Sequence, residues 1–198
     1  MNRAGAALIG STIARTIGLA LALAALVAAS GCGRDDELVE VAYFAEWEDV
    51  SARVWIPTDE PRSIGTYRAE VKWPGGTTDR IQAERDGMIT GVWLADLESD
   101  GALDLVVALS SAGSGSYGSV HVYRHRNEDF VPVVVPDLDA EQTGYMGHDV
   151  FTVEEGRLYR TFPRYVEGDP NAAPSGGQVR LRCSFDENAW IAETDSDD

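Results

Sequence analysis

Short strand-like runs recur along almost the whole chain after residue 40, and no other feature of the sequence restricts the fold as strongly. The runs are rich in β-branched and aromatic residues, and clusters of Gly, Pro, Asp and Ser separate them. No long segment repeats its apolar residues with a sustained helical period. This pattern is typical of an all-β sandwich or barrel. The predicted strands span residues 41–47, 53–56, 66–73, 80–83, 88–94, 103–109, 120–124, 130–135, 150–153, 158–162, 179–185 and 189–192.

The clearest alternation of apolar and polar residues lies near the C-terminus. Val179, Leu181, Cys183 and Phe185 share one face of a predicted strand, and we expect this face to lie in the core. A nucleophilic cysteine needs partial exposure and an electropositive setting. Cys183 is therefore predicted to be a buried, inert thiol.

The first 31 residues predict an export signal that is no part of the fold. Arg3 and Arg15 supply positive charge, and residues 17–29 are apolar and rich in Ala and Leu. The small residues before Cys32 resemble a bacterial lipobox, in which the cysteine is lipidated and becomes the first mature residue. An ordinary cleaved signal, with Cys32 as a bystander, is the alternative. Gly33 follows in place of Asp, which by resemblance to bacterial sorting patterns favours the outer membrane.

The sequence therefore divides into a lipoprotein signal peptide over residues 1–31, an acidic tether over 32–40 and a single domain over 41–198. The last residues of that domain form an acidic tail. Cleavage takes away two of the 16 basic residues and none of the 33 acidic ones, which leaves a net charge of −19. Nucleic acid is excluded as a partner because phosphate binding needs a basic surface. A cationic protein would instead be attracted.

An acidic turn between two predicted strands carries the strongest hint of a metal site. Asp96, Glu98 and Asp100 stand at alternate positions before Gly101, as in a calcium loop, and Asp96, Asp100 and Asp104 are the candidate ligands. An EF-hand would need Glu where Val107 stands, and strands rather than helices flank the turn, so we favour a hairpin turn with acidic caps. No set of nucleophile, base and orienting residue is evident. We predict no enzymatic activity, no cofactor and no metal.

A Gly- and Ser-rich stretch over residues 110–119 joins two strand-like runs and presents one large side chain, Tyr117. Its letters match the dinucleotide fingerprint G-x-G-x-x-G, but a strand follows it, so no helix N-terminus is available for a pyrophosphate. We predict a protruding loop. Two irregular stretches, 137–147 and 167–177, could help to shape a binding surface.

Two motifs in this half of the chain resemble those of a known family. Residues 114–117 have the form S-G-x-Y, and residues 158–177 read LYRTFPRYVEGDPNAAPSGG. Together with the acidic turn, they resemble the bacterial periplasmic inhibitors of invertebrate-type (I-type) lysozymes over most of residues 88–185. The resemblance implies an antiparallel β-sandwich whose S-G-x-Y loop is inserted into the active-site cleft of the lysozyme.

Carried over by position, the resemblance makes Ser114 and Tyr117 the contacting residues, while Gly115 permits the turn and Ser116 occupies the variable position. The Ser and Tyr hydroxyls can donate to the catalytic carboxylates of a lysozyme. The implied partner is an I-type lysozyme, with a homodimer as one possible assembly. The lipobox and Gly33 place the protein in the bacterial cell envelope, facing the periplasm from the outer membrane, and this anchor departs from the family, whose best-known members are soluble in the periplasm.

Two other hypotheses stay open on the sequence alone. One is an envelope lipoprotein of the same fold that binds another protein or a glycan ligand without catalysis. The other is a carbohydrate-active enzyme, which would have to turn over peptidoglycan or simple glycosides. One sandwich fold hosts many functions, so fold does not decide among them.

Overall fold

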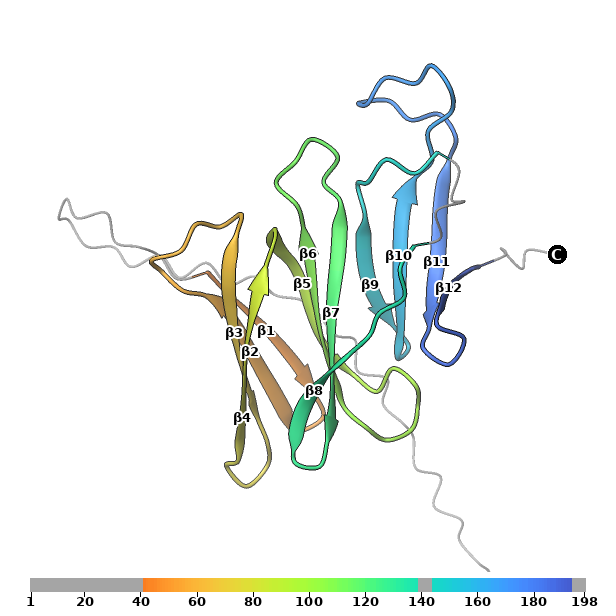
Figure 1. Ribbon diagram of the computed structural model, residues 1–198. Coiled ribbons are helices and arrows are strands. Elements are labelled where there is room, and N and C mark those ends of the chain that lie inside the picture. Colours follow the sequence, from red (N-terminus) through yellow and green to blue (C-terminus); the bar gives the residue numbers. More distant parts are fainter. Residues whose placement is uncertain (1–40, 139–143, 194–198) are drawn as a thin grey trace, which may run out of the picture.

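The computed structural model describes residues 41–138 and 144–193 (Figure 1). The predicted signal peptide, Cys32 and the tether lie outside the described residues. The described residues form twelve β-strands and no helix, and hence no helix that could cross a membrane. The strands are β1 (Val41–Trp47), β2 (Val50–Ile56), β3 (Gly65–Lys72), β4 (Thr78–Arg85), β5 (Met88–Ala95), β6 (Asp104–Ser110), β7 (Gly118–Arg126), β8 (Asp129–Val133), β9 (Val150–Glu154), β10 (Arg157–Pro163), β11 (Gln178–Ser184) and β12 (Ala189–Ala192).

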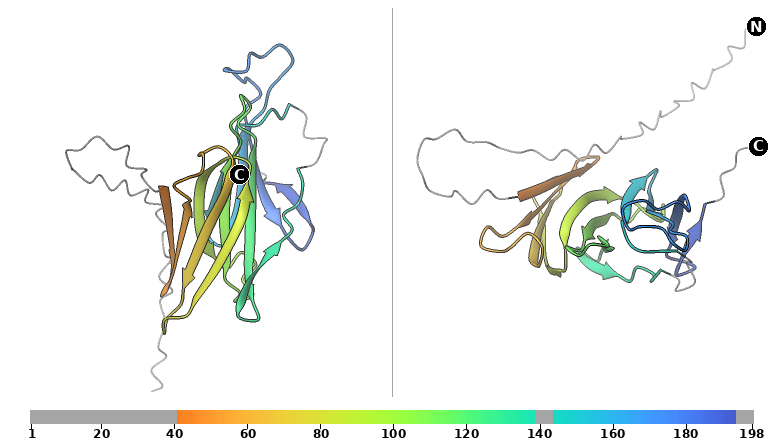
Figure 2. Two further views of the ribbon diagram at one scale, coloured as in Figure 1. Left: turned by 60° about the vertical axis from the view of Figure 1, so that its left-hand side comes forward. Right: turned by 90° about the horizontal axis from the view of Figure 1, so that it is seen from above.

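The strands form three four-stranded sheets, β1–β4, β5–β8 and β9–β12, each a meander in chain order. Every pairing is antiparallel, as expected where successive strands are joined by short connections. Each strand overlaps one predicted run, so the all-β, antiparallel prediction is confirmed. The sandwich is three sheets deep, and the view from above shows the sheets side by side (Figure 2).

The middle sheet is covered on both faces, which explains the continuous apolar run of β6. Leu105, Val107 and Leu109 belong to the core shared with the first sheet. Val106 and Ala108 belong to the core shared with the third sheet. Because side chains alternate along a strand, a strand that is buried on both faces must be apolar at nearly every position.

The alternation predicted for the C-terminal strand is confirmed at its centre, while Val179 and Phe185 of the predicted core face are only half-buried. Leu181 and Cys183 of β11 are buried, and burial raises the pKa of the Cys183 thiol to about 12. The thiol therefore stays protonated at neutral pH. It has the character of a core residue and not of a nucleophile.

Antiparallel meanders bring alternate connections to the same end of the molecule. The connections β2–β3, β4–β5, β6–β7, β8–β9 and β10–β11 lie at one end, which we call the loop end. The β6–β7 and β10–β11 loops project there, at the top of Figure 1. The acidic turn between β5 and β6 lies at the opposite end.

Candidate functional site

The loop between β6 and β7, residues 111–117, is tied to itself by backbone hydrogen bonds. The amide of Ser111 donates to the carbonyl of Tyr117 at 2.9 Å, and the amide of Ser116 donates to the carbonyl of Gly113 at 2.9 Å. Ser116 takes a positive φ of 43°. Tyr117 remains 52% exposed. The loop therefore presents a large aromatic side chain, and hydrogen bonds within its own backbone hold the loop together.

Gly115 is needed because the ring of Tyr117 lies over it. A Cβ atom at Gly115 would lie 2.5 Å from Cε2 of Tyr117, closer than real Cβ contacts come. Its φ is not in the left-handed region. The glycine predicted to permit the turn is thus required for the close approach of the ring.

The end of the β8–β9 connection, residues 144–149, supports the loop from one side. The amide of His148 donates to the carbonyl of Gly115 at 2.7 Å. Gly147 permits this approach, since a Cβ there would lie 2.0 Å from the same carbonyl oxygen. The ring of Tyr145 meets that of Tyr117 edge-on, with centroids 5.8 Å apart.

A buried carboxylate joins these segments to β10. The side chain of Asp149 is fully buried. Its Oδ2 accepts from the amide of Gly118 at 2.7 Å and from the hydroxyl of Tyr145 at 2.6 Å. Its Oδ1 accepts from Nε of Arg160 at 2.6 Å. Arg160 also donates to the Tyr145 hydroxyl at 2.7 Å. We call Tyr145, Asp149 and Arg160 the Asp149 cluster.

Aromatic rings surround the guanidinium of Arg160. It lies 5.2 Å from the ring centroid of Tyr145, 5.5 Å from Phe151 and 5.7 Å from Trp190. Ring faces and the carboxylate offset the cost of burying this charge. Burial, together with the hydrogen bond to Asp149, raises the pKa of Tyr145, so its hydroxyl stays protonated and donates.

The β10–β11 loop flanks the site on another side. The amide of Tyr165 donates to the carbonyl of Gly144 at 2.8 Å, and Nδ2 of Asn171 reaches the carbonyl of Ser114 at 3.5 Å. Asp169 accepts from the amides of Val166 and Ser175, and these bonds hold the pKa of its carboxyl below the usual range. Residues of both irregular stretches therefore reach the loop.

Exposed apolar side chains accompany Tyr117 on these segments. Met146 is 43% exposed and Val166 is 49% exposed. Met88, 47% exposed, stands at the start of β5 opposite Ser110. Apolar surface next to an exposed tyrosine is suited to contact with another protein.

Sequence reasoning gave Asp149 no role, although it is the centre of this arrangement. One signal was present: Arg160 directly follows Leu158 and Tyr159 in a predicted strand, and a charged residue in a buried strand needs a buried partner. The sequence did not identify the partner of Arg160. Asp149 lies outside the strand that carries Arg160, and the chain has 33 acidic residues, any of which could have been that partner.

The acidic turn is arranged differently from a calcium loop. Asp96 accepts from the amides of Asp100 and Gly101, and Asp100 accepts from the amide of Ala102. Asp104 is buried and bonded to Arg124 at 2.8 Å. Within residues 41–138 and 144–193, no group of three His, Cys, Asp or Glu side chains is placed to hold a metal ion.

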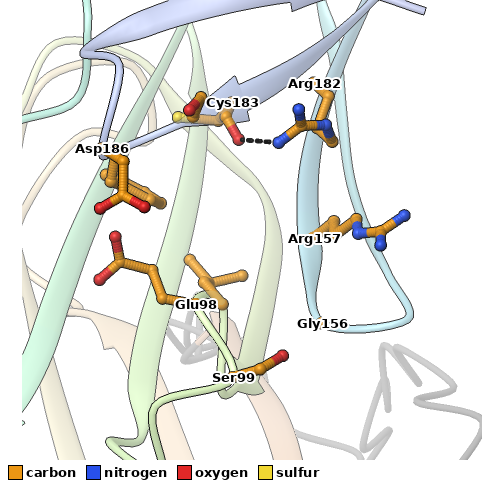
Figure 3. A pocket seen from close by; sticks show the side chains of 10 residues that line it. Glu98, Ser99, Gly156, Arg157, Arg182, Cys183 and Asp186 are labelled. Carbon is orange, nitrogen blue, oxygen red and sulfur yellow. Dashed lines mark hydrogen bonds between the residues drawn. The ribbon is translucent and has the colours of Figure 1, made fainter.

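A polar hollow of about 250 Å³ lies beside the same turn, away from the loop end. Glu98 and Asp186 line one side of it, and Arg157 and Arg182 line the other (Figure 3). Nη1 of Arg182 is turned towards the carbonyl of Cys183, 3.5 Å away. The acidic and basic groups do not converge on a common point in this view, in contrast to the groups around residues 111–117.

Comparison with known proteins points to one family. The family model described as periplasmic lysozyme inhibitor of I-type lysozyme matches residues 50–145. That range contains residues 114–117, Tyr145 and the acidic turn, and ends before residues 158–177. No curated protein matches the chain.

Two solved structures of Aeromonas hydrophila PliI are similar in sequence. One, in complex with Meretrix lusoria lysozyme, is 30% identical over 42% of this chain and 73% of that chain. The other, described as a periplasmic lysozyme inhibitor of I-type lysozyme, is 27% identical over 46% of this chain and 87% of that chain. Both have a TM-score of 0.37, which does not support an argument from the superposed shapes.

Proposed function

Because the chain belongs to the family of periplasmic inhibitors of I-type lysozyme, we propose that it inhibits such a lysozyme by inserting residues 114–117 into the active-site cleft. The observation that carries this proposal is the exposure of Tyr117 on a loop whose backbone is held from three sides. A convex, ordered loop with an aromatic tip is suited to filling a concave site.

Two hydroxyls supply the polar contacts of the proposed complex. Among the described residues, no hydrogen bond uses the hydroxyl of Ser114 or that of Tyr117, so both can donate to a partner. A lysozyme cleft carries two carboxyl groups, and hydrogen bonds to ionised groups are the stronger kind. The ring of Tyr117 adds a large apolar contact at a small cost in conformational entropy.

The charge of the chain favours a basic enzyme as the partner. The formal net charge is −17 for the whole sequence, and it becomes more negative if the predicted signal is removed. Complementary charge raises the association rate more than the final affinity. Inhibition is then simple occlusion of the cleft, and the protein itself performs no catalysis.

The same proposal places the protein in the periplasm, as the family description states for the family. We extend this to an outer-membrane lipoprotein with lipid on Cys32, supported by the small residues before that cysteine. The division at residues 31 and 40 belongs to this part of the proposal. Mass spectrometry of the membrane fraction tests it, because an unmodified N-terminus after cleavage would contradict lipidation.

Replacement of Tyr117 by Ala tests the loop directly. Loss of a central aromatic anchor weakens an interface by about 2 kcal/mol or more, which is roughly thirtyfold in the inhibition constant. The matched control is Phe44→Ala, because Phe44 is also an exposed aromatic residue at 46% and lies on β1. Residual activity of Meretrix lusoria lysozyme is the measurement. Equal inhibition by both variants would remove the loop from the mechanism.

A panel of I-, C- and G-type lysozymes separates the inhibitor from an envelope lipoprotein that binds another protein or a glycan. Inhibition of an I-type enzyme is expected. Inhibition of none of them would favour the alternative.

A further inference from the structure

The Asp149 cluster contains a buried ion pair beside a loop that its own backbone already closes. Residues 111–117 already make two backbone hydrogen bonds within the loop. Burying an ion pair and a hydroxyl among aromatic rings costs free energy of folding unless every polar group has a hydrogen-bond partner. Its placement directly behind Tyr117 therefore calls for an explanation.

The cluster fixes the two neighbours of the Tyr117 side chain. Asp149 accepts from the amide of Gly118, the residue immediately after Tyr117. Gly118 has no room for a side chain, since a Cβ would lie 2.5 Å from the Cβ of Asp149. On the other side, Tyr145 makes edge contacts with both Tyr117 and Phe162. Tyr145 is thereby fixed at its hydroxyl and at its ring.

We infer that Tyr145, Asp149 and Arg160 are positioning residues that hold Tyr117 in its binding orientation before a lysozyme arrives. A Gly- and Ser-rich loop is flexible by composition, and ordering it during binding would cost conformational entropy. The cluster meets that cost during folding. The inference rests on the proposed function, because it assumes that Tyr117 enters a cleft.

Arg160 has a second consequence for such a partner. A buried carboxylate alone behind Tyr117 would repel the carboxyl groups of a lysozyme cleft. The guanidinium of Arg160, 2.6 Å from Asp149, neutralises that charge. The aromatic cage then holds the guanidinium away from solvent.

Tyr145→Phe is the sharpest test, because it removes one hydroxyl and keeps the ring that contacts Tyr117. Tyr43→Phe is the control. Tyr43 lies on β1 of the first sheet, and its hydroxyl donates to the carbonyl of Ile89 on β5 at 2.8 Å. Tyr145→Phe loses two hydrogen bonds, one to Asp149 and one from Arg160, and Tyr43→Phe loses one. Urea unfolding is therefore expected to show a loss of stability in both variants, with the larger loss in Tyr145→Phe.

Inhibition of Meretrix lusoria lysozyme and hydrogen exchange of the Gly118 amide are the two readouts. Tyr145→Phe is expected to raise the inhibition constant about fivefold and to speed exchange at Gly118, whose amide is released only when its bond to Asp149 opens. Tyr43→Phe should change neither. Asp149→Asn, a second variant, should also speed exchange at Gly118.

Three results would overturn the inference. Inhibition by Tyr145→Phe that equals the wild type while Gly118 exchanges faster would show that preset geometry does not matter. Equal weakening by Tyr43→Phe would assign the effect to general stability. Unchanged exchange at Gly118 in both cluster variants would show that the cluster does not hold the loop. If the wild type inhibits no lysozyme, the proposed function fails, and the exchange measurements alone decide the positioning role.

Discussion

Each end of the molecule has a buried Asp–Arg pair, but the connections beside the two pairs present different surfaces. At the loop end, Asp149 accepts from the amide of Gly118, the first residue of β7, through one oxygen and from Nε of Arg160 through the other. At the opposite end, Asp104 accepts from the amide of Leu97 through one oxygen and from Nε of Arg124 through the other. In both cases an Asp–Arg pair, buried at the end of the sandwich, fixes the connection beside it.

What differs is the surface that each fixed connection presents. In the acidic turn, Asp96 and Asp100 cap amides of the turn itself, and Arg124 also contacts Glu98. The polar groups are used internally. Loop 111–117 leaves Tyr117 half exposed, and no described partner uses its hydroxyl. A buried ion pair therefore marks a rigid connection, and only the exposed groups indicate a binding surface.

Replacing each buried carboxylate in turn has the largest expected effect on stability. It also shows which of the two buried pairs matters for inhibition. Asp104→Ala and Asp149→Ala each leave a buried guanidinium without its main partner. We expect each to lower the free energy of unfolding by about 3–5 kcal/mol, measured by urea unfolding. Per folded molecule, Asp104→Ala should inhibit lysozyme as the wild type does, whereas Asp149→Ala should inhibit less.

Equal inhibition by the two folded variants would break this comparison. It would mean that the loop end, like the acidic turn, is rigid for reasons of stability alone. Circular dichroism of both proteins before the assay provides the control, because the comparison holds only for folded molecules.

Two glycine substitutions within the loop test the role of its geometry in inhibition, with a smaller expected effect than removal of a buried carboxylate. Gly115→Ala places a Cβ 2.5 Å from the Tyr117 ring and must displace that ring. Gly113→Ala is the matched control, because the nearest atom to its Cβ is Oγ of Ser111 at 4.0 Å. We expect about tenfold weaker inhibition for the former and little change for the latter, measured against the same enzyme.

A similar loss in both glycine variants would assign the effect to backbone flexibility. In that case the contact of the Tyr117 ring with Gly115 would not be what determines inhibition.

The strands were accessible to sequence analysis because their signals are local. Alternation placed Leu181 and Cys183 in the core, and the apolar run over residues 103–109 predicted the strand β6, although not its burial on both faces. The loop was predicted for the same reason, since residues 110–119 are rich in Gly and Ser and this composition is a local signal. That three sheets stack, and not two, depends on which faces meet, and single strands do not encode this.

The support of the loop could not be derived from the sequence. Asp149 and Gly118 are 31 positions apart, and their contact arises only when the second and third sheets pack. Tyr145 and Arg160 are 15 positions apart, and their contact arises only when the end of the β8–β9 connection lies beside β10. The same holds for the acidic turn. Asp100 and Asp104 stand four positions apart in the sequence, yet one caps the turn and the other is buried against Arg124.

The smallest expected effect concerns the hydrogen bond by which the β10–β11 loop reaches the carbonyl of Ser114. Nδ2 of Asn171 reaches the carbonyl of Ser114 at 3.5 Å, which is long for a hydrogen bond and correspondingly weak. Asn171→Ala keeps the backbone carbonyl that accepts from Tyr165, so the loop itself should hold its shape. We expect a change in the inhibition constant of less than about twofold. A tenfold loss would instead place residues 164–177 in direct contact with the lysozyme, and the binding surface at the loop end would then extend beyond residues 111–117.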